Sequence, residues 1–437
     1  MKYFSLNYNA RDVGFLEAVT KGLAPDRGLY FPKQIPKLEH DFINNLDQYS
    51  DHEIAYEVIQ QYVGDDIYSN DLKKIIQDTL SFNFPIIEIT DKIALLELFH
   101  GPTLAFKDVG ARFMARCLSY NNDIKKEGDL TILVATSGDT GGAVADGFYK
   151  VKGIDVIILY PKGKVSDIQE RQLTTLGENI IPLEVDGTFD DCQEMVKSAF
   201  VDPELKENIN LTSANSINIA RWLSQMFYYF IAYKNRPNPD KKIIFSVPSG
   251  NFGNICAGII AKQMGLPIDH FIASTNINDT VPEFLKSGSY TPKKSIQTIS
   301  NAMDVGNPSN FIRIQKIFNN DFFKLKKVLS GFGYTDKLTE KALKEIFKIN
   351  GYIADPHGAI GFLGLKQYMA SLKNEEAYQG IFLETAHPIK FKNTVENILK
   401  TKIETPTRLR GILNLKKIRS PLSKYSELKS LLLSRNK

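Results

Sequence analysis

Short apolar runs alternate with helical patterns along most of this chain, and this alternation constrains its fold more than any other feature. Runs typical of buried strands occupy residues 93–98, 131–135, 154–159, 180–185, 243–247 and 271–275. Strands that alternate with helices form mostly parallel sheets with helices on both faces. The pattern therefore predicts an α/β fold. Because a chain of 437 residues is too long for one simple core, we expect two or three lobes.

The first 82 residues have a different character. Their helical patterns follow a tyrosine- and proline-rich opening, which suggests extended backbone lying over a neighbouring element. We predict an amino-terminal domain at residues 1–82 and a larger region at residues 83–437 in two lobes of twisted sheet. Within that region, residues 216–234 form the most aromatic stretch, and we expect one core helix buried on both sides.

The segment GPTLAFKD, residues 101–108, places Lys107 where an apolar run turns into a helix. Apolar residues then recur every three or four positions, so Lys107 lies in the first helical turn. The positive end of the helix dipole and burial would both disfavour an ammonium there. A lysine that tends toward the neutral amine can condense with a carbonyl and form a Schiff base. The alternative is an ordinary solvated lysine.

A turn rich in glycine and hydroxyl groups, residues 136–142, connects the strand-like run 131–135 to a helical stripe. Such a turn presents backbone N–H groups and hydroxyls at a helix N-terminus, where a carboxylate or a phosphate can bind. The alternative is an ordinary N-cap, in which Ser137, Asp139 or Thr140 bonds the first amides of the helix.

A second turn, SGNFGN at residues 249–254, follows the strand-like run 243–247 and also precedes a helical stripe. Its glycines tolerate positive φ, so several amides can approach an anion closely. The pattern is neither a P-loop nor the GxGxxG dinucleotide fingerprint. The alternative is a turn that only packs the strand against the helix.

A Schiff-base lysine, a carboxylate turn and a phosphate turn are what pyridoxal phosphate requires of a protein. Six ordered segments of the chain resemble those of threonine synthases, which belong to the β-family (fold type II) of pyridoxal phosphate enzymes. These segments lie within residues 4–32, 101–108, 135–144, 215–221, 247–254 and 384–391. The resemblance implies a fold similar to the tryptophan synthase β chain. Arg27 departs from the pattern, since glycine is usual there in this family.

The resemblance also implies roles for individual residues. Lys107 would form the Schiff base and carry protons, and Asp139 would contact the phenolic oxygen of the cofactor. Ser137 and Thr140 would hold the substrate carboxylate, and Thr385 would face the pyridine nitrogen. The cofactor phosphate would be bound by Ser249, Gly250, Asn251, Phe252, Gly253 and Asn254.

The implied reaction converts O-phospho-L-homoserine and water to L-threonine and phosphate, the last step of threonine biosynthesis. It combines γ-elimination of phosphate with β-addition of water. The leaving phosphate needs cationic or amide donors, for which we favour Arg221 and Asn218 over Lys162 and Lys164. Two alternatives stay open. A threonine or serine dehydratase would share the lysine and the phosphate turn, and a noncatalytic homologue would bind a phosphorylated ligand through the same turns.

The composition indicates a soluble protein of the cytoplasm, which agrees with the small-molecule substrate that the resemblance implies. The net charge is +4, from 54 basic and 50 acidic residues, so no nucleic acid partner is expected. We find neither a signal peptide nor an apolar run of the roughly 20 residues needed to span a membrane. Cys117, Cys192 and Cys256 are too scattered for disulfides or a metal site, and we expect buried thiols. The sequence is compatible with an oligomer.

Overall fold

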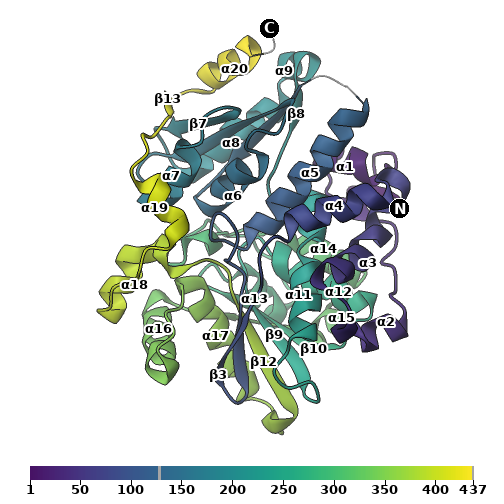
Figure 1. The fold of residues 1–437 in the computed structure, drawn as a ribbon, viewed down its shortest axis with the longest axis vertical. Coiled ribbons are helices and arrows are strands. Elements are labelled where there is room, and N and C mark those ends of the chain that lie inside the picture. The colour runs from purple at the N-terminus through teal and green to yellow at the C-terminus, as the bar shows by residue number, and fades with distance from the viewer. Residues whose placement is uncertain (126–128, 436–437) are drawn as a thin grey trace.

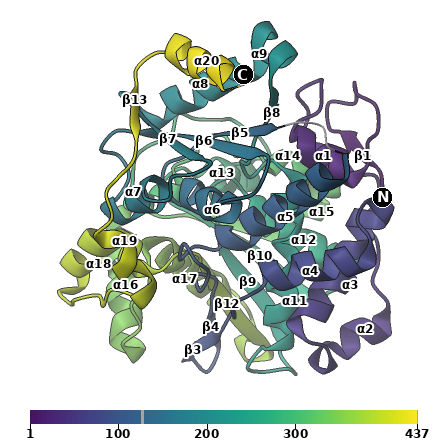
Figure 2. The same cartoon turned by 45° about the horizontal axis from the view of Figure 1, so that its top comes forward.

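The chain forms two packed sheets, a small third sheet and the helices that cover them (Figure 1). The computed structural model describes residues 1–125 and 129–435. Helices α5 (Lys107–Lys125) and α6 (Asp139–Phe148) lie between the five-stranded sheet and the six-stranded sheet (Figure 2). The two sheets define two lobes, and the α/β fold expected from the sequence is confirmed.

The larger sheet has six strands in the order β11-β10-β9-β12-β4-β3. Its strands are β3 (Ile86–Thr90), β4 (Ile93–Glu97), β9 (Lys242–Pro248), β10 (Ile268–Thr275), β11 (Leu329–Gly333) and β12 (Tyr378–Glu384). All neighbours run parallel except β3, which pairs antiparallel with β4. The late strand β12 lies between the early strand β4 and β9, so the centre of this sheet joins distant parts of the chain.

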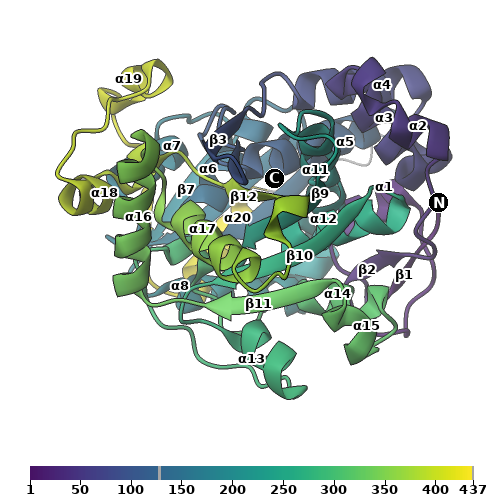
Figure 3. The same ribbon diagram turned by 90° about the horizontal axis from the view of Figure 1, so that it is seen from below.

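Both faces of the six-stranded sheet are buried, as is typical of parallel sheets. Ile244, Ile272 and Phe382 pack on the side of α16 (Asp336–Asn350) and α17 (Pro356–Met369). The alternate residues Phe245, Phe271 and Ile381 pack into the main core, to which α11 (Met226–Lys234) and α12 (Gly253–Met264) also contribute. Figure 3 shows α16 and α17 beside this sheet from below.

The smaller lobe contains a five-stranded parallel sheet in the order β13-β7-β6-β5-β8. Its strands are β5 (Leu130–Ala135), β6 (Ile154–Pro161), β7 (Ile180–Val185), β8 (Asn210–Thr212) and β13 (Ser420–Leu422). The helices of this lobe include α7 (Asp167–Thr174), α8 (Phe189–Val201), α9 (Pro203–Asn208), α19 (Thr407–Leu413) and α20 (Tyr425–Ser434). The carboxyl-terminal segment therefore adds an edge strand to a sheet built from the middle of the chain.

The first 80 residues pack against α5 and the core helices. They contain β1 (Tyr3–Ser5), α1 (Phe15–Lys21), β2 (Tyr30–Pro32), α2 (His40–Asn44), η1 (Leu46–Gln48), α3 (Asp51–Val63), η2 (Gly64–Asp66) and α4 (Ser69–Thr79). Strands β1 and β2 form an antiparallel pair. Arg27, in the turn before β2, adopts φ 65°, so it keeps the left-handed backbone that glycine favours.

The remaining helical elements complete the larger lobe. They are α10 (Ile219–Leu223), α13 (Thr280–Ser287), η3 (Asn301–Met303), α14 (Phe311–Ile317), α15 (Phe322–Lys326), η4 (Glu375–Ala377), η5 (Pro388–Phe391) and α18 (Lys392–Leu399). The prediction of one helix over residues 216–234 is wrong, because α10 ends at Leu223 and α11 begins at Met226. Side-chain bonds accompany this break: Ser224 Oγ donates to Ala220 O at 2.8 Å, where the backbone bond from Ser224 N is long at 3.4 Å, and Gln225 Nε2 donates to Arg221 O at 2.7 Å.

The burial expected for this aromatic stretch is confirmed. Trp222, Phe227, Tyr228, Tyr229 and Phe230 are fully buried.

The three cysteines are also buried and form no disulfide, as expected for core thiols. Along the described part of the chain, no helix is both long enough and apolar enough to cross a membrane.

Candidate active site

Lys107 lies where three parts of the chain meet. The segment just before it pairs with the chain that leaves β12, through a bridge between Ala105 and Ala386 and a hydrogen bond from Phe106 N to Thr385 O at 2.9 Å. Lys107 is the first residue of α5, as the sequence predicts. Its Nζ lies 4.5 Å from the centre of the Phe106 ring. The lysine is therefore held by the carboxyl end of a central strand.

The surroundings of Lys107 favour a neutral amine. The pKa of the lysine is lowered to about 8, mainly by burial; Lys390 and Arg221 act in the same direction as burial, and Asp139 and Asp355 oppose it. These four charged side chains come from distant segments, and the structure brings them together around one amine. The electrostatic prediction for Lys107 is thus supported by its geometry.

Asp139, the first residue of α6, forms a buried ion pair in this site. Its Oδ1 lies 2.7 Å from Lys390 Nζ and accepts a hydrogen bond from Gln169 Nε2 at 2.9 Å. Burial acts to raise the pKa of Asp139, but Lys390 and Lys107 outweigh it and hold that pKa well below its usual range. The sequence analysis did not select Lys390, although it lies within the segment ETAHPIKF that follows Thr385.

The turn before α6 keeps two hydroxyl groups available. Thr136 Oγ1 organises the turn by accepting hydrogen bonds from Gly138 N at 3.0 Å and Gly141 N at 2.8 Å. Ser137 and Thr140 are partly buried, and their hydroxyls form no hydrogen bond to any other described residue. The N-cap alternative for Ser137 is therefore not what the structure shows, since Gly138 precedes the helix and no side chain caps it.

The turn at residues 249–254 also has the geometry of an anion site. Phe252 adopts φ 61°, and Gly253 begins α12, so the turn delivers the chain to a helix N-terminus. A Cβ on Gly250 would lie 2.8 Å from Ala302 O and 2.9 Å from Met303 Cα. Ser249 is tied to Val247 O by its hydroxyl at 2.8 Å, and Asn251 Oδ1 accepts from Ser309 Oγ at 3.1 Å.

Asn254, at the start of α12, carries an unsatisfied donor. Tyr229 OH donates to its Oδ1 at 2.5 Å, whereas its buried Nδ2 has no hydrogen-bond partner among the described residues. A buried donor without an acceptor is costly unless a ligand or water supplies one. The turn and this amide therefore fit a phosphate group, which is the part of pyridoxal phosphate that the sequence assigns to this turn.

Arg221 and Asn218 lie side by side at α10 but differ in availability. Asn218 is the N-cap of α10, and its Oδ1 accepts from Ala220 N at 3.0 Å while its Nδ2 donates to Val19 O at 2.8 Å. Arg221 is buried and bonds Ala214 O, and its Nε has no partner within the described residues. Burial lowers the pKa of Arg221 to about 10, with Tyr228 opposing that effect. Arg221 thus offers an unpaired cationic donor, whereas Asn218 is largely committed to structure.

The remaining predicted residues are also located. Thr385 is buried directly after β12, and its carbonyl pairs with Phe106. Lys162 and Lys164 are exposed in the loop after β6. Within the described ranges, no cluster of three or more histidine, cysteine or acidic residues could hold a metal ion.

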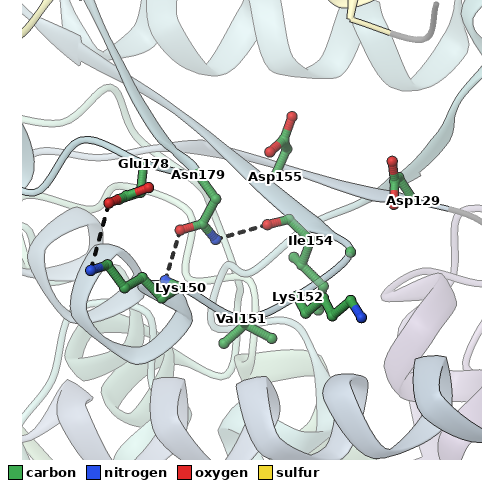
Figure 4. A pocket seen from close by; sticks show the side chains of 9 residues that line it. Asp129, Lys150, Val151, Lys152, Ile154, Asp155, Glu178 and Asn179 are labelled. Carbon is green, nitrogen blue, oxygen red and sulfur yellow. Dashed lines mark hydrogen bonds and ion pairs between the residues drawn. The ribbon is translucent and has the colours of Figure 1, made fainter.

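A surface hollow of about 390 Å³ lies at the opposite end of the smaller lobe (Figure 4). Asp129, Ile154 and Asn179 line it at the starts of β5, β6 and β7. Ligands of open α/β sheets bind beyond the carboxyl ends of the strands, where Ser137 and Asp139 lie. Lys150 and Glu178 pair across this hollow at 3.6 Å, and its position separates it from the Lys107 site.

A fold of two parallel sheets with a buried lysine and an anion-binding turn defines the pyridoxal phosphate enzymes of fold type II. Residues 88–379 match the family described as pyridoxal-phosphate dependent enzyme. Residues 2–80 match the threonine synthase N terminus, and residues 359–430 match the threonine synthase C-terminal family. The chain belongs to the threonine synthase family.

Similar proteins and structures agree with this assignment. The chain is 46% identical to a threonine synthase of Buchnera aphidicola subspecies Baizongia pistaciae, over 100% of both chains. It is 42% identical to that of Escherichia coli, over 94% of both. The Escherichia coli threonine synthase structure has a TM-score of 0.92 at 40% identity, and the pyridoxal phosphate-bound structure from Brucella melitensis has a TM-score of 0.92 at 33% identity, each covering 100% of both chains.

Proposed function

We infer that this chain is a pyridoxal phosphate-dependent threonine synthase, which converts O-phospho-L-homoserine and water to L-threonine and phosphate. The observation that carries this conclusion is Lys107, a lysine with a lowered pKa at the junction of β12, α5 and α6, in a chain with full-length similarity to threonine synthases. The reaction is the last step of threonine biosynthesis.

We propose that the two turns and Thr385 hold the cofactor around Lys107. The phosphate lies against Ser249, Gly250, Asn251, Phe252, Gly253 and Asn254, supported by the unpaired Asn254 Nδ2. Thr385 faces the pyridine nitrogen, and Asp139 lies near the phenolic oxygen. Ser137 and Thr140 hold the substrate carboxylate, supported by their available hydroxyls. When bound, the cofactor would supply an electron sink that stabilises negative charge on the substrate carbon that bears the amino group.

Lys107 then moves the protons of the reaction. Once its amine is released by the incoming substrate, it removes the α-proton and then a β-proton, and phosphate leaves from the γ-carbon. The oxygen of water adds at the β-carbon, and protons return to the α- and γ-carbons. One base serves several carbons, which requires a flexible side chain with a pKa near the working pH. The lowered pKa of Lys107, about 8, meets this requirement.

Arg221 is the residue that we assign to the phosphate of the substrate. Its buried guanidinium retains an unpaired Nε and acts on the pKa of Lys107, which supports a position near the reacting atoms. Charge-assisted bonds of this kind suit a dianion that must leave. Asn218 contributes by holding α10, on which Arg221 lies, and its amide is a secondary donor.

We also propose that residues 1–82 form the amino-terminal domain, that residues 83–437 form the catalytic region, and that the enzyme acts in the cytoplasm. Supporting observations are the balanced charge and the three unpaired thiols, which suit a reducing compartment. Nucleic acid has no part in this proposal, and assembly of several copies is compatible with it. Threonine synthase activity confined to the cytosolic fraction of fractionated cells would support this location.

An assay of products separates this function from the alternatives. We expect phosphate release from O-phosphohomoserine and little ammonia release from threonine. The purified protein should show an absorbance band near the border of the visible and ultraviolet ranges, which borohydride bleaches and which is missing in Lys107→Ala. Ammonia without phosphate would identify a dehydratase, and a protein that never takes up pyridoxal phosphate would exclude both enzymes.

A further inference from the structure

A chain of hydrogen bonds runs behind the site, from the end of β12 to the phosphate turn. Glu384 is the last residue of β12, and its Oε2 accepts from Asp355 N at 3.2 Å. Asp355 caps α17, and its Oδ1 accepts from His357 N at 2.7 Å and lies 2.5 Å from His357 Nδ1. His357 Nε2 accepts from Ala302 N at 3.2 Å. No role in the reaction described above uses these residues.

The hydrogen-bond donors around His357 determine which of its ring nitrogens carries the proton. Because Ala302 N can only donate, His357 Nε2 must be the unprotonated ring nitrogen. Its Nδ1 therefore carries the proton and donates it to Asp355 Oδ1. The imidazole is neutral, and one oxygen of Asp355 is fully satisfied.

Two carboxylate oxygens of this hydrogen-bond network are left without a partner among the described residues. Asp355 Oδ2 and Glu384 Oε1 are buried without a hydrogen-bond partner, and both residues are 0% exposed. The two residues are direct neighbours through the bond from Asp355 N to Glu384 Oε2, and burial, followed by the charge of Asp355, raises the pKa of Glu384 well above its usual range. Two neighbouring buried carboxylates that each leave an oxygen unpaired are unfavourable, whereas one proton shared by the pair relieves both.

We propose that Glu384 is a neutral carboxylic acid that donates a hydrogen bond to Asp355, and that this pair is a positioning device of the cofactor site. The pair then carries a single negative charge, which lies on Asp355. That charge acts on Lys107 and opposes the cations Lys390 and Arg221. Glu384 itself touches no reacting atom and acts through the elements that it joins.

The position of the pair explains how it can hold both ends of the site. The residue after Glu384 is Thr385, whose carbonyl binds the segment that leads into Lys107. At the other end, Ala302 packs against Gly250 of the phosphate turn. Gly358 leaves space for the pair, since a Cβ there would lie 1.8 Å from Glu384 Oε1. A shift of the carboxyl pair would therefore move Thr385, proposed to face the pyridine nitrogen, together with Gly250 of the proposed phosphate turn.

The neighbouring charged groups do not favour ionisation of Glu384. Asp355 on the α17 side and Glu97 on β4 are the charged groups that act most strongly on it, and both raise its pKa. Tyr352 OH donates to Glu97 Oε1 at 2.7 Å, and burial, Glu384 and Glu97 raise the pKa of that tyrosine well above its usual value. His387, beside them, has its pKa lowered to about 4 by burial, so it is neutral.

Thermal unfolding of the full chain as a function of pH tests the proton. A group whose folded-state pKa is raised loses its stabilising contribution as pH rises above the unfolded value. Glu384→Gln keeps the donor without the titration. We therefore expect the difference in Tm between Glu384→Gln and the wild type to change in favour of the variant by about 1 to 2 °C per pH unit above pH 5. Glu88→Gln, an exposed site on β3 of the same sheet, should show a constant difference. A constant difference for Glu384→Gln would overturn the proposal.

Cofactor binding tests the positioning role, which rests on the proposed function, whereas the unfolding test does not. Glu384→Gln should bind pyridoxal phosphate within about threefold of the wild type, because the amide donates the same hydrogen bond. Glu384→Leu should bind about tenfold more weakly, with an altered absorbance maximum of the bound cofactor. Equal binding by the two variants would refute the positioning role. If the leucine variant does not fold, weak binding by the glutamine variant would refute it, since a charge would then be required.

Discussion

Lys107 shares its surroundings with two cations and two anions, so its proton affinity depends on a balance of opposing charges. Desolvation decides this balance, because it is the largest influence on the pKa and favours the uncharged amine. Asp139 and Lys390 largely neutralise one another as a close ion pair at 2.7 Å. The result is an amine whose pKa lies near neutral pH, in a site that still contains the cations Lys390 and Arg221 to attract an anionic ligand.

The lowered pKa makes the capture of pyridoxal phosphate dependent on pH. Only the neutral amine attacks an aldehyde, and the protonated fraction of Lys107 grows as pH falls below its pKa of about 8. We expect the rate of capture by the cofactor-free protein to fall about tenfold per pH unit below that value, measured by stopped-flow absorbance. A rate that still rises steeply above about pH 9, as for free lysine, would show an ordinary amine.

The buried ion pair makes Lys390→Met strongly destabilising. The substitution leaves Asp139 buried without its closest cation, and we expect the free energy of unfolding to fall by about 3 kcal/mol. The pKa of Asp139 lies below its usual range, so this contribution is present at neutral pH and is lost as pH falls through the folded-state pKa. Urea titration measures the loss.

The double variant Asp139→Asn with Lys390→Met is the control for that experiment. It removes both charges, so most of the lost stability should return. Equal destabilisation by the single and the double variants would show that packing of the lysine, and not its charge, is what matters.

At the scale of elements, the site is assembled from the beginnings of helices and the carboxyl end of a strand. Helix α5 begins with Lys107, α6 with Asp139 and α12 with Gly253, and each follows a strand or a strand-paired segment. Helix N-termini present unpaired N–H groups, and three of them meet here. The common orientation of the parallel strands is what brings these starts to one side of the sheets.

Gly250→Ala tests the close packing of the phosphate turn. The new methyl group would approach Ala302 O to 2.8 Å and Met303 Cα to 2.9 Å, so backbone must move. Such overpacking costs about 1–3 kcal/mol, and we expect affinity for pyridoxal phosphate to fall about tenfold in equilibrium titration. Gly411→Ala in α19 is the matched control, since a Cβ there meets nothing within 4 Å. Unchanged affinity for Gly250→Ala would argue against this turn as the phosphate site.

Local patterns revealed the strands β4, β5, β6, β7, β9 and β10, the position of Lys107 and both turns, because each depends on residues close together in the sequence. The break between α10 and α11 was not predicted, since the side-chain bonds that Ser224 and Gln225 make to the backbone of α10 leave the apolar pattern unchanged. Lys390 was also missed. Its role depends on an ion pair with Asp139, which lies on another lobe and is reached only through the tertiary fold.

At the scale of the whole molecule, buried polar side chains join the amino-terminal segment to the core. Arg313 is 0% exposed, and its Nη2 donates to Tyr30 O at 2.9 Å and to Ile217 O at 2.7 Å. Its guanidinium also stacks 4.3 Å from the ring of Trp222. Asn218 adds a second connection, through Val19 O. The first 80 residues are therefore part of the same packed unit as the helices that carry Arg221.

We expect Arg313→Met to weaken the whole molecule and not one lobe alone. Two buried carbonyl groups would lose their donor, and the free energy of unfolding should fall by about 3 kcal/mol in urea titration. Arg410→Met, at an exposed position on α19, should have little effect. Release of the amino-terminal segment by limited proteolysis, with the remainder unchanged in stability, would contradict this coupling.

The central place of β12 has a consequence for biogenesis. Strand β4 is made early, yet its parallel neighbour ends at Glu384, and the partner of Asp139 is Lys390. On the ribosome, one edge of β4 thus lacks its parallel neighbour until most of the polypeptide is translated, and such long-range pairing is slow. The nascent enzyme cannot mature in stages, and a truncated product would remain both inactive and prone to aggregate.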